Sequence, residues 1–298
     1  MKNKTLVGCL CALSCEVLFG LSYVFTKQAT ESAGAFELLG WRFFTAFLVM
    51  TLLVITGTVK INLKGKKLKS LLLVALFSPV IYFIGETVGI ANTSASESGV
   101  FLACIPVVSL AASSLILKKK PTGRQTMGIV ITLAGVLVTV FAAGASASLS
   151  VAGYIFLTIA VISYALYSVF VEKAVDFTEA EITYIQLCAG ALVFVVTALV
   201  KGFANGTARD LIALPFRNIH FLIAILYQGI GCSILAFFMS NAAIARIGVN
   251  RTSSFIGAST VVSILAGMLI LSEPFSLMQL VGAIIIIAGI YSANKAAE

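Results

Sequence analysis

Ten stretches of about 20 predominantly apolar residues follow one another along this chain, and no other feature limits its fold as strongly. A helix of this length is long enough to cross the hydrocarbon core of a bilayer. The stretches are residues 5–27, 35–57, 70–91, 96–117, 124–141, 150–171, 180–200, 219–242, 252–271 and 275–293. The segments between them are short, and even the longest, residues 201–218, is expected as a loop too short to fold alone. We therefore predict an all-α integral membrane protein with ten transmembrane helices.

The composition leads to the same environment. Hydrophobic residues make up 60% of the 298 residues and charged residues only 11%, whereas soluble domains contain about 25% charged residues. A single water-soluble core cannot bury that much apolar surface. The net charge of +8 does not indicate nucleic acid binding, because the basic residues lie in short segments between the apolar stretches. The lipid bilayer is therefore an expected partner, and nucleic acid is not.

The basic residues also predict how the chain is oriented. Lys and Arg accumulate on the cytoplasmic side of membrane proteins. With the N-terminus inside, 15 of the 20 Lys and Arg residues fall on the inner side and four on the outer side, and Arg42 lies within a span. We therefore expect both termini in the cytoplasm, in a multi-pass protein of the cell inner membrane or plasma membrane.

The chain contains an internal repeat at an offset of 154 residues. Residues 101–135 align with residues 255–289 without a gap, and 13 of the 35 positions are identical. The identical positions include Gly128/Gly282 and Gly135/Gly289. Each repeat holds five spans, and an odd number of spans makes the second copy enter the membrane from the opposite side. We therefore predict two inverted five-helix repeats, residues 1–145 and 146–298, as in many secondary transporters.

Two sequence features resemble a known family. The segment CEVLFGLSYVFTKQA, followed by LLGWRFFTAFLV, is similar to the opening of EamA-type repeats, with an aromatic-Gly pair, a Lys near the end of the first helix and an Arg-Phe pair in the second. The segments LKKKPTGRQTMGIVITLAG and LSEPFSLMQLVGAIIIIAG resemble the end of such repeats, with a Pro and a Gly-x6-Gly helix. The chain therefore resembles the ten-helix EamA branch of the drug/metabolite transporter superfamily.

The resemblance implies a transporter whose cavity opens between the two repeats. Spans one to four and six to nine would line this cavity, and spans five and ten would lie outside it. One position departs from the family pattern. Lys119 stands where such repeats commonly have Glu and where the second repeat has Glu273.

The chain lacks the residues that membrane enzymes and metal sites need. The only histidine is His220, the six cysteines show no CxxC spacing, and both aspartates, Asp176 and Asp210, lie between spans. Metal sites usually need several His or Cys ligands, and HExxH, Walker and dinucleotide motifs are absent. We therefore expect no enzyme activity, no metal and no cofactor.

Glu16 is the strongest candidate for a functional charge. It lies eleven residues into the first span, roughly 16 Å along the helix and therefore near the bilayer midplane. An ionised carboxylate there costs about 3 kcal/mol on insertion scales, and protonation avoids this cost. Its Cys-Glu-Val context resembles the Ala-Glu-Val around the essential first-helix carboxylate of the small multidrug resistance family. We predict that Glu16 carries a proton, the alternative being a packing role in which it bonds to neighbouring hydroxyls.

Arg42 and Glu86 form a second candidate pair. Arg42 lies about two turns from the outer end of the second span, and Glu86 lies about one turn from the outer end of the third. At similar depth they either bind an anionic or zwitterionic substrate together or form an ion pair that only holds two helices. Gln186 is the neutral counterpart of Arg42 in the second repeat.

Further polar and aromatic candidates lie at comparable depth in the spans. They are Tyr82, Tyr164, Tyr167, Ser168, Tyr227 and Asn241. Such side chains either stack on an apolar or aromatic substrate or hydrogen-bond between helices. Pro106 in the fourth span predicts a bend that a gate helix can use. The glycines shared by spans five and ten predict close packing of helices, within the chain or in a homodimer.

The expected function is secondary transport of a small-molecule substrate. The leading hypothesis is export of a small metabolite, such as an amino acid, by alternating access with proton coupling. It follows from the family resemblance and from the suitability of Arg42 with Glu86 for a zwitterion. A drug or organic-cation exporter is the alternative, favoured if Glu16 faces the substrate and Arg42 is tied to Glu86. A non-transporting scaffold is a third hypothesis, which the inverted repeat disfavours.

Overall fold

The computed structural model consists of helices and connecting segments, with no strand, in the part that it describes, which is residues 2–93, 98, 101–142, 150–272 and 276–294. A helix pairs its backbone N–H and C=O groups internally, which an apolar environment requires. The prediction of an all-helical protein is therefore confirmed for the described residues.

The elements divide into a first half, up to residue 142, and a second half, from residue 150. The first half contains α1 (Lys2–Thr30), α2 (Ala35–Ile55), α3 (Lys69–Ala75), the π-helical segment η1 (Leu76–Ile81), α4 (Tyr82–Ala91), α6 (Ile105–Ile116) and α7 (Gly123–Ala142). The second half contains α8 (Val151–Lys173), α9 (Glu179–Ala204), α10 (Ala208–Arg217), α11 (Ile219–Leu226), the π-helical η2 (Tyr227–Ala236), α12 (Phe237–Thr252), the 3-10 turn η3 (Ser253–Phe255), α13 (Gly257–Leu271) and α14 (Leu277–Asn294).

Eight runs of continuous helix in the described chain are long and apolar enough to cross a membrane. Two further apolar helices, Phe101–Ile116 and Gly257–Leu271, are shorter. They occupy the places of the fourth and ninth predicted spans. The described residues of the ten predicted stretches are therefore mostly helical, but only eight of the helices are long enough to span a membrane.

The third and eighth spans are interrupted helices. Each contains a π-helical segment, and in η1 the backbone leaves the helical region at Ser78 (φ −142°, ψ 120°), next to Pro79. Proline has no N–H and crowds the preceding turn, so it disrupts a helix interior. The bend at Pro106 stays a prediction: Pro106 lies in the first turn of α6, two residues after a turn at Cys104 within the longer helix Phe101–Ile116.

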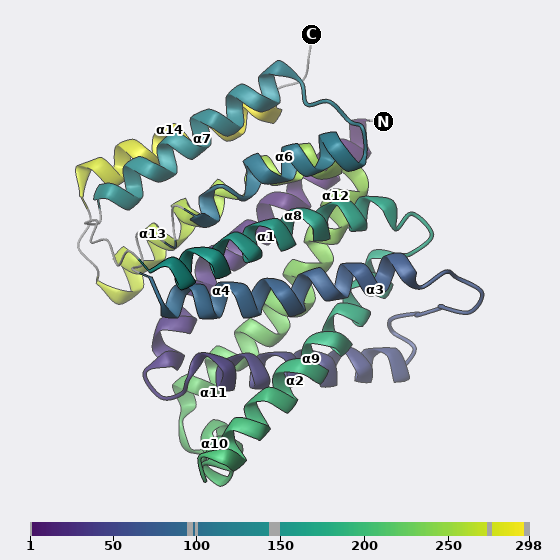
Figure 1. The fold of residues 1–298 in the computed structure, drawn as a ribbon, viewed down its shortest axis with the longest axis vertical. Helices are drawn as coiled ribbons and strands as arrows, with labels where there is room; N and C mark the ends of the chain where they lie inside the picture. The colour runs from purple at the N-terminus through teal and green to yellow at the C-terminus, as the bar shows by residue number, and fades with distance from the viewer. Residues whose placement is uncertain (1, 94–97, 99–100, 143–149, 273–275, 295–298) are drawn as a thin grey trace.

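The segment expected as a loop between the seventh and eighth spans contains a helix. α9 continues to Ala204, and α10 follows as a short helix that buries Leu211 and exposes Phe216. The Trp41 Nε1–H donates a hydrogen bond to the Leu211 carbonyl at 2.9 Å. This bond attaches α10 to α2 at one edge of the bundle (Figure 1).

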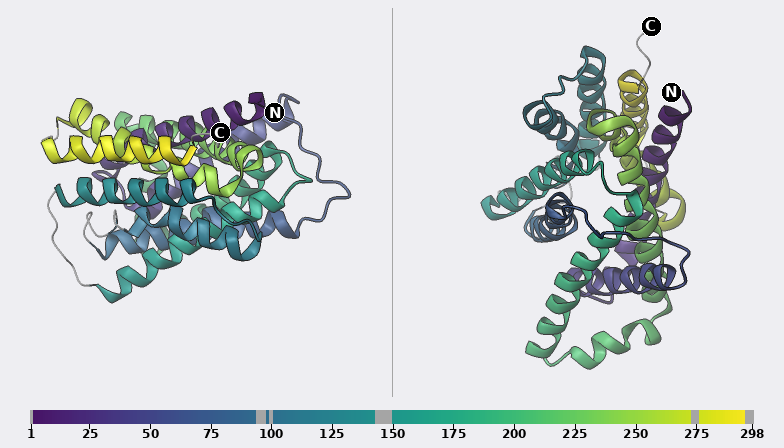
Figure 2. Two further views of the ribbon diagram at one scale, coloured as in Figure 1. Left: turned by 90° about the horizontal axis from the view of Figure 1, so that it is seen from above. Right: turned by 90° about the vertical axis from the view of Figure 1, so that its right-hand side faces the viewer.

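The contacts between helices repeat across the two halves. α7 packs along α14 and α2 packs along α9, and the views show α7 and α14 side by side at one edge of the bundle (Figures 1 and 2). α1 packs against α13 and against α11, η2 and α12, while α8 packs against α6 and against α3, η1 and α4. Each half therefore places its first helix against the third and fourth helical regions of the other half.

Glycines bring α7 and α14 into backbone contact. A Cβ atom added to Gly128 would lie 2.6 Å from the Gly289 carbonyl oxygen, and one added to Gly135 would lie 2.8 Å from that of Gly282. Small residues at such positions let helix backbones approach closely. The two helices are antiparallel, with Gly128 opposite Gly289 and Gly135 opposite Gly282. The glycine stripe is therefore used within the chain.

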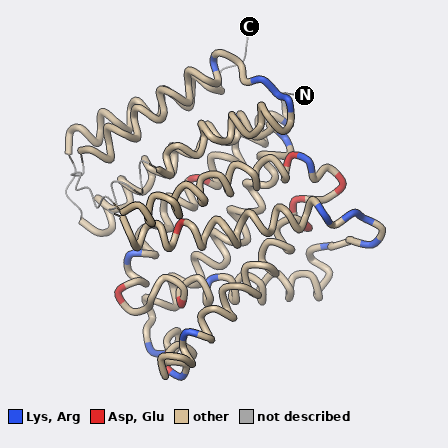
Figure 3. Tube along the Cα trace, in the orientation of Figure 1, with Lys and Arg blue, Asp and Glu red and all other residues tan. Residues whose placement is uncertain are grey.

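Basic residues gather at one end of the bundle (Figure 3). The N-terminus of α1 and the C-terminus of α14 both point toward this end. We call it the basic end, formed by residues 56–68, 117–122 and 174–178 and the C-terminus of α12. Its ion pairs are Lys66–Glu181, Lys119–Glu172 and Arg246–Glu179. The first two join the first half of the chain to the second. Glu273, the counterpart of Lys119, lies outside the described residues.

We predict that Gly135→Ala destabilises the protein, because the new methyl group would lie 2.7 Å from the backbone nitrogen of Ile286 and would force the helices apart. Overpacking of this kind costs about 1–3 kcal/mol, which should lower the midpoint of thermal unfolding in detergent by a few degrees. Gly123→Ala is the control, because nothing lies within 4 Å of its added Cβ. Equal midpoints for the two variants would contradict the glycine contact.

Candidate functional site

Three ionisable side chains lie inside the bundle: Glu16 on α1, Arg42 on α2 and Glu86 on α4. Glu16 and Arg42 are 6% and 7% exposed, and Glu86 is half-buried. Arg42 lies within electrostatic range of Glu86 and Tyr82, and Glu16 lies within range of Tyr82 and Tyr164. Charges inside an apolar bundle are costly and mark functional sites. We call these five residues the central polar cluster.

Arg42 is held on two sides. Its Nε donates a hydrogen bond to Ser233 Oγ on η2 at 2.7 Å. Its guanidinium carbon lies 4.8 Å from the centre of the Phe83 ring and 5.5 Å from that of Phe43, within the range of cation–π attraction. Its Nη2 is buried and has no hydrogen-bond partner among the described residues. A buried guanidinium nitrogen without an acceptor is suited to an anionic group of a ligand.

Glu86 does not neutralise Arg42 by direct contact. The ion pairs of the described residues do not include one between Arg42 and Glu86. Instead, the Tyr82 hydroxyl, one turn away on the same helix, donates to Glu86 Oε1 at 2.7 Å. The hydrogen bond fixes the orientation of the carboxylate. Neither charge is therefore neutralised by direct contact with the other in the described structure.

Glu16 meets the second half of the chain. Its carboxyl group lies close enough to Ser259 on α13 for the Ser259 hydroxyl to act on it electrostatically. The Ser259 Oγ–H donates to the Ile256 carbonyl at 2.7 Å. One turn further along α1, a Cβ added to Gly20 would lie 2.7 Å from the Ser259 carbonyl oxygen. This close approach of α1 and α13 sets Glu16 against Ser259.

Two tyrosines offer ring surface beside the charges. The ring centres of Tyr82 and Tyr164 lie 5.6 Å apart, and those of Tyr164 and Tyr167 lie 5.5 Å apart, each in an edge-to-face arrangement. Tyr82 and Tyr164 are half-buried, whereas Tyr167 is only 3% exposed. Only the first two therefore keep accessible surface for a ligand.

Tyr167, Asn241 and Gln186 form a separate hydrogen-bond network. The Tyr167 hydroxyl donates to Asn241 Oδ1 at 2.8 Å, and Asn241 Nδ2 donates to Gln186 Oε1 at 2.8 Å and to Thr183 Oγ1 at 3.1 Å. Gln186 Nε2 donates to the carbonyl of Ser78, at the break in η1, at 2.9 Å. The network joins α8, α9, α12 and η1, which favours the hydrogen-bonding alternative for these three candidates.

The hydroxyl groups of Ser168 and Tyr227 donate to backbone carbonyls. The Ser168 hydroxyl donates to the Tyr164 carbonyl of its own helix at 3.0 Å. The Tyr227 hydroxyl donates to the Leu18 carbonyl on α1 at 3.0 Å, and its ring stacks on Phe25 with centres 4.1 Å apart. These two candidates are therefore separate in role from the central polar cluster.

Three residues that contact the candidate residues were not predicted from the sequence. Ser233 gives Arg42 an acceptor, Phe83 gives it an aromatic face, and Ser78 gives Gln186 a backbone carbonyl. Only Ser78 has a signal in the sequence, which is the neighbouring Pro79 within an apolar stretch. Serine and phenylalanine are ordinary residues of membrane spans, so Ser233 and Phe83 carry no signal of their own.

Two cavities lie away from the central polar cluster. One of about 490 Å³ lies between α1, α13 and α14, and one of about 250 Å³ lies between α2, α9 and α10. Neither is lined by Glu16, Arg42 or Glu86. In the part of the chain that the structure describes, no group of three or more His, Cys, Asp or Glu is placed to hold a metal ion. The candidate site is thus defined by its charges.

Comparison with known proteins places this geometry in a family. Residues 6–141 and 151–294 match the model of the EamA-like transporter family. A Bacillus subtilis protein named uncharacterized transporter YcxC is 32% identical, over 99% of this chain and 95% of that protein. A Salmonella typhimurium protein named probable amino-acid metabolite efflux pump is 23% identical, over 61% of this chain and 62% of that protein.

The fold is also similar to one seen experimentally. A crystal structure of a protein superposes with a TM-score of 0.76, covering 98% of this chain and 96% of that chain, at 17% sequence identity. At this identity the similarity concerns the fold alone.

We predict that Tyr167→Phe lowers the stability of the protein by about 1–3 kcal/mol, because it leaves the buried Asn241 Oδ1 without a donor. The KM of transport should not change, because the hydroxyl holds helices and does not meet the substrate. Tyr291→Phe is the matched control, since Tyr291 is 66% exposed. Thermal unfolding and transport in proteoliposomes provide the two measurements. A raised KM with unchanged stability would contradict the structural role.

Proposed function

Because the chain belongs to the EamA-like transporter family, we propose that it is a secondary active transporter that exports a small metabolite, such as an amino acid, by alternating access with proton coupling. The membership confirms the resemblance found in the sequence, and the chain is a multi-pass membrane protein with long apolar helices. The observation that carries the proposed substrate is Arg42, whose buried Nη2 has no partner among the described residues.

Arg42 supports a substrate that contains a carboxylate. A guanidinium presents a planar set of N–H donors that matches the two oxygens of a carboxylate. Ser233 and Phe83 already fix the guanidinium through its Nε and its face, so little side-chain freedom is lost when a ligand binds. Binding also gives the buried cation a counter-ion, which offsets part of its desolvation.

Glu86 supports an amino group on the same substrate. Its carboxylate is oriented by Tyr82 and makes no ion pair with Arg42 in the described structure. A zwitterion would place its carboxylate at Arg42 and its ammonium group at Glu86. The half-buried rings of Tyr82 and Tyr164 would contact the ammonium group or an apolar side chain. The name of the Salmonella typhimurium relative, an amino-acid metabolite efflux pump, agrees with this substrate class.

The two alternatives receive less support. An organic-cation exporter is favoured if Glu86 ties up Arg42, and that ion pair is absent among the described residues. A scaffold without transport activity disagrees with the family, whose members are named as transporters.

We further propose that the chain consists of two inverted five-helix repeats, residues 1–145 and 146–298, with the shorter apolar helices as spans four and nine. The glycine contacts support this, because Gly128 matches Gly282 in sequence but contacts Gly289. Gly135 likewise matches Gly289 in sequence but contacts Gly282. A two-fold relation between the halves produces this exchange of partners. The boundary itself lies outside the described residues.

The charge distribution supports an orientation with both termini in the cytoplasm of a cell inner membrane or plasma membrane. The basic end carries most of the loop Lys and Arg residues, and the described ends of α1 and α14 point toward it (Figure 3). Basic loops remain on the cytoplasmic side during insertion. A homodimer would need a face other than the glycine stripe, because α7 and α14 cover that stripe within one chain.

Ion pairs at the basic end suit a gate between the halves. Lys66–Glu181 and Lys119–Glu172 each join the first half to the second. Glu172 Oε2 also accepts a hydrogen bond from the Val249 amide at 2.7 Å. The Lys119 side chain is 62% exposed, and ion pairs of exposed side chains are worth about 0–1 kcal/mol, so the Lys119–Glu172 contact can open and re-form in every transport cycle.

Glu16 supports proton coupling. The Ser259 hydroxyl proton is engaged with the Ile256 carbonyl, which leaves Ser259 Oγ free to accept. A protonated Glu16 can donate to it, whereas an ionised Glu16 would compete for the same proton. When the cavity changes sides and Glu16 is hydrated, the carboxyl can release its proton.

We predict that amino acids, and not quaternary amines, raise the thermal unfolding midpoint of the purified protein. Arg42→Lys keeps the charge but loses the planar fork, so it should weaken binding of the stabilising amino acid about tenfold or more. The midpoint without ligand should change much less. Arg209→Lys is the matched control, because Arg209 is exposed on α10. Stabilisation by quaternary amines alone would favour the organic-cation alternative. If Arg42→Lys lowers binding and stability equally, Arg42 has a structural role.

Replacement of Glu16 tests the coupling. Glu16→Gln permanently mimics the protonated form, so we expect it to abolish substrate accumulation driven by a pH gradient in proteoliposomes. Counterflow exchange of labelled for unlabelled substrate should remain. The control is Glu31→Gln, because Glu31 is an exposed carboxylate at the end of the first helical region. If Glu16→Gln still accumulates substrate, Glu16 is a packing residue and Glu86 becomes the next coupling candidate.

A further inference from the structure

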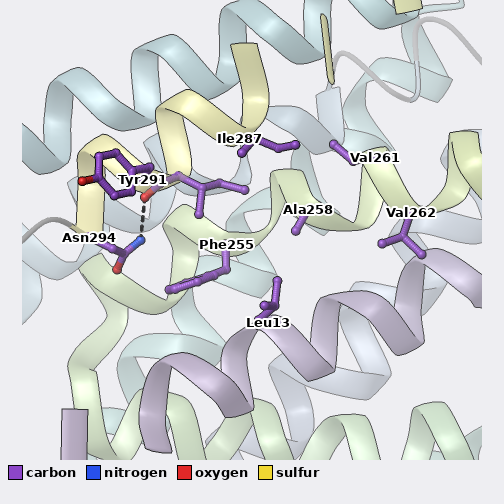
Figure 4. A pocket seen from close by; sticks show the side chains of 9 residues that line it. Leu13, Phe255, Ala258, Val261, Val262, Ile287, Tyr291 and Asn294 are labelled. Carbon is purple, nitrogen blue, oxygen red and sulfur yellow. Dashed lines mark hydrogen bonds between the residues drawn. The ribbon is translucent and has the colours of Figure 1, made fainter. Parts of the chain in front are cut away.

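The cavity of about 490 Å³ is a groove on a face of the bundle that the proposed transport site does not use. Leu13 comes to it from α1, Val261 and Val262 from α13, and Ile287 and Tyr291 from α14 (Figure 4). Apart from the Tyr291 hydroxyl and Asn294, the lining is apolar. A groove of this composition in a membrane protein suits hydrocarbon.

The groove lies on the surface of the bundle and is shorter than half of a bilayer core. Leu13, Ile287 and Tyr291 are 43%, 56% and 66% exposed. The stretch of α14 from Ile287 to Asn294 spans about 10 Å of helix, less than half of a bilayer core of about 30 Å. Tyr291 and Asn294 lie at one end of the groove and Val262 at the other (Figure 4). The polar end is thus toward the basic end of the bundle, at the C-terminus of α14.

Arg251 is a cation at the polar end for which the described residues provide no carboxylate partner. Arg251 donates from Nη2 to the backbone carbonyl of Asn294 at 3.1 Å, and it lies four residues before Phe255, which lines the groove. The ion pairs of the described residues include Lys66, Lys119 and Arg246 at the basic end but not Arg251. Its charge is therefore complementary to an anion at the mouth of the groove.

Asn294 adds an unused acceptor at the same place. Its Nδ2 donates to Ser254 Oγ at 2.7 Å and to the Ile290 carbonyl at 3.0 Å. Its Oδ1 is buried and has no hydrogen-bond partner among the described residues. A hydroxyl group on a ligand held at Arg251 would satisfy it.

We propose that this groove binds an anionic phospholipid from the leaflet at the basic end. One acyl chain lies along Leu13, Val261 and Ile287, and the phosphate is held by Arg251. A glycerol headgroup supplies a hydroxyl to Asn294 Oδ1. Basic residues near the membrane surface each contribute about 1 kcal/mol to binding of anionic lipid, so the charge sets the choice of headgroup and the apolar groove holds the chain.

The lipid would act on the same helix pair that carries Glu16. Val262, in the groove wall, meets α1 at Gly20, where an added Cβ would lie 2.6 Å from it. Ser259, which lies close to Glu16, is one turn before Val262 on α13. An acyl chain in the groove therefore supports the α1–α13 contact from the lipid side. The proposal does not depend on which substrate is transported.

Native mass spectrometry of the full chain in detergent tests the proposal. Phosphatidylglycerol and phosphatidylcholine with the same acyl chains are the probes, and the native protein should bind phosphatidylglycerol more tightly. Arg251→Gln should lower the affinity for phosphatidylglycerol about fivefold and the affinity for phosphatidylcholine less, because the choline group offsets the charge of its phosphate. Lys120→Gln removes the same charge from an exposed side chain at the basic end and should change neither. Arg251→Lys should bind nearly as the native protein does, which separates loss of charge from loss of fold.

A second pair of variants tests the groove itself. Ile287→Trp fills the groove and should remove binding of both lipids, whereas Ile284→Trp, 59% exposed and outside the lining, should not. Equal binding of phosphatidylglycerol by the native protein, Arg251→Gln and Ile287→Trp would overturn the proposal, as would equal affinity of the native protein for both lipids. A lipid-free dimer that Ile287→Trp dissociates would overturn it in favour of a second copy in the groove.

Discussion

Backbone groups inside a bilayer have no water to bond to, so every interruption of a helix needs a partner from elsewhere in the protein. The third span breaks at Ser78, and the carbonyl of Ser78 accepts a hydrogen bond from Gln186. Gln186 is oriented by Asn241, and Asn241 by Tyr167. One interruption thereby fixes α8, α9 and α12 relative to one another, and α4 continues beyond it to carry Glu86 into the central polar cluster.

The lack of water also separates the charges of this chain into two kinds. At the basic end, carboxylates are neutralised by direct partners, as Glu181 is by Lys66 and by the Asn62 amide. Inside the bundle, Arg42 has a hydroxyl and two aromatic rings around it, and the ion pairs of the described residues give it no carboxylate partner. Aromatic faces stabilise a cation without neutralising it. Arg42 thus differs from the cations Lys66, Lys119 and Arg246 at the basic end, each of which is paired with a carboxylate.

Patterns that extend over many residues were predictable, and single contacts were not. Hydropathy located the helices, because a span needs about 20 apolar residues and the sum over such a window is robust. The shared glycines predicted the close packing of α7 and α14. They did not predict whether the two helices would belong to one chain or to two copies in a dimer. α10 was missed because Arg209, Asp210 and Pro215 interrupt its apolar pattern. The contact of Arg42 with Ser233 joins residues 191 positions apart, and no local pattern reports a contact of that kind.

Two helix pairs each join corresponding helices of the two halves. Their positions limit how this molecule can move. α7 lies against α14 at one edge of the bundle, and α2 lies against α9 near the other (Figure 1). A pivot line drawn through both pairs would leave each contact almost stationary while one half tilts against the other. Displacement grows with distance from such a line, so the ends of α1, α4, α8 and α12 would travel farthest. In the proposed alternating access, this tilt would expose the central polar cluster to one side of the membrane and then to the other, while the glycine contact between α7 and α14 stays in place.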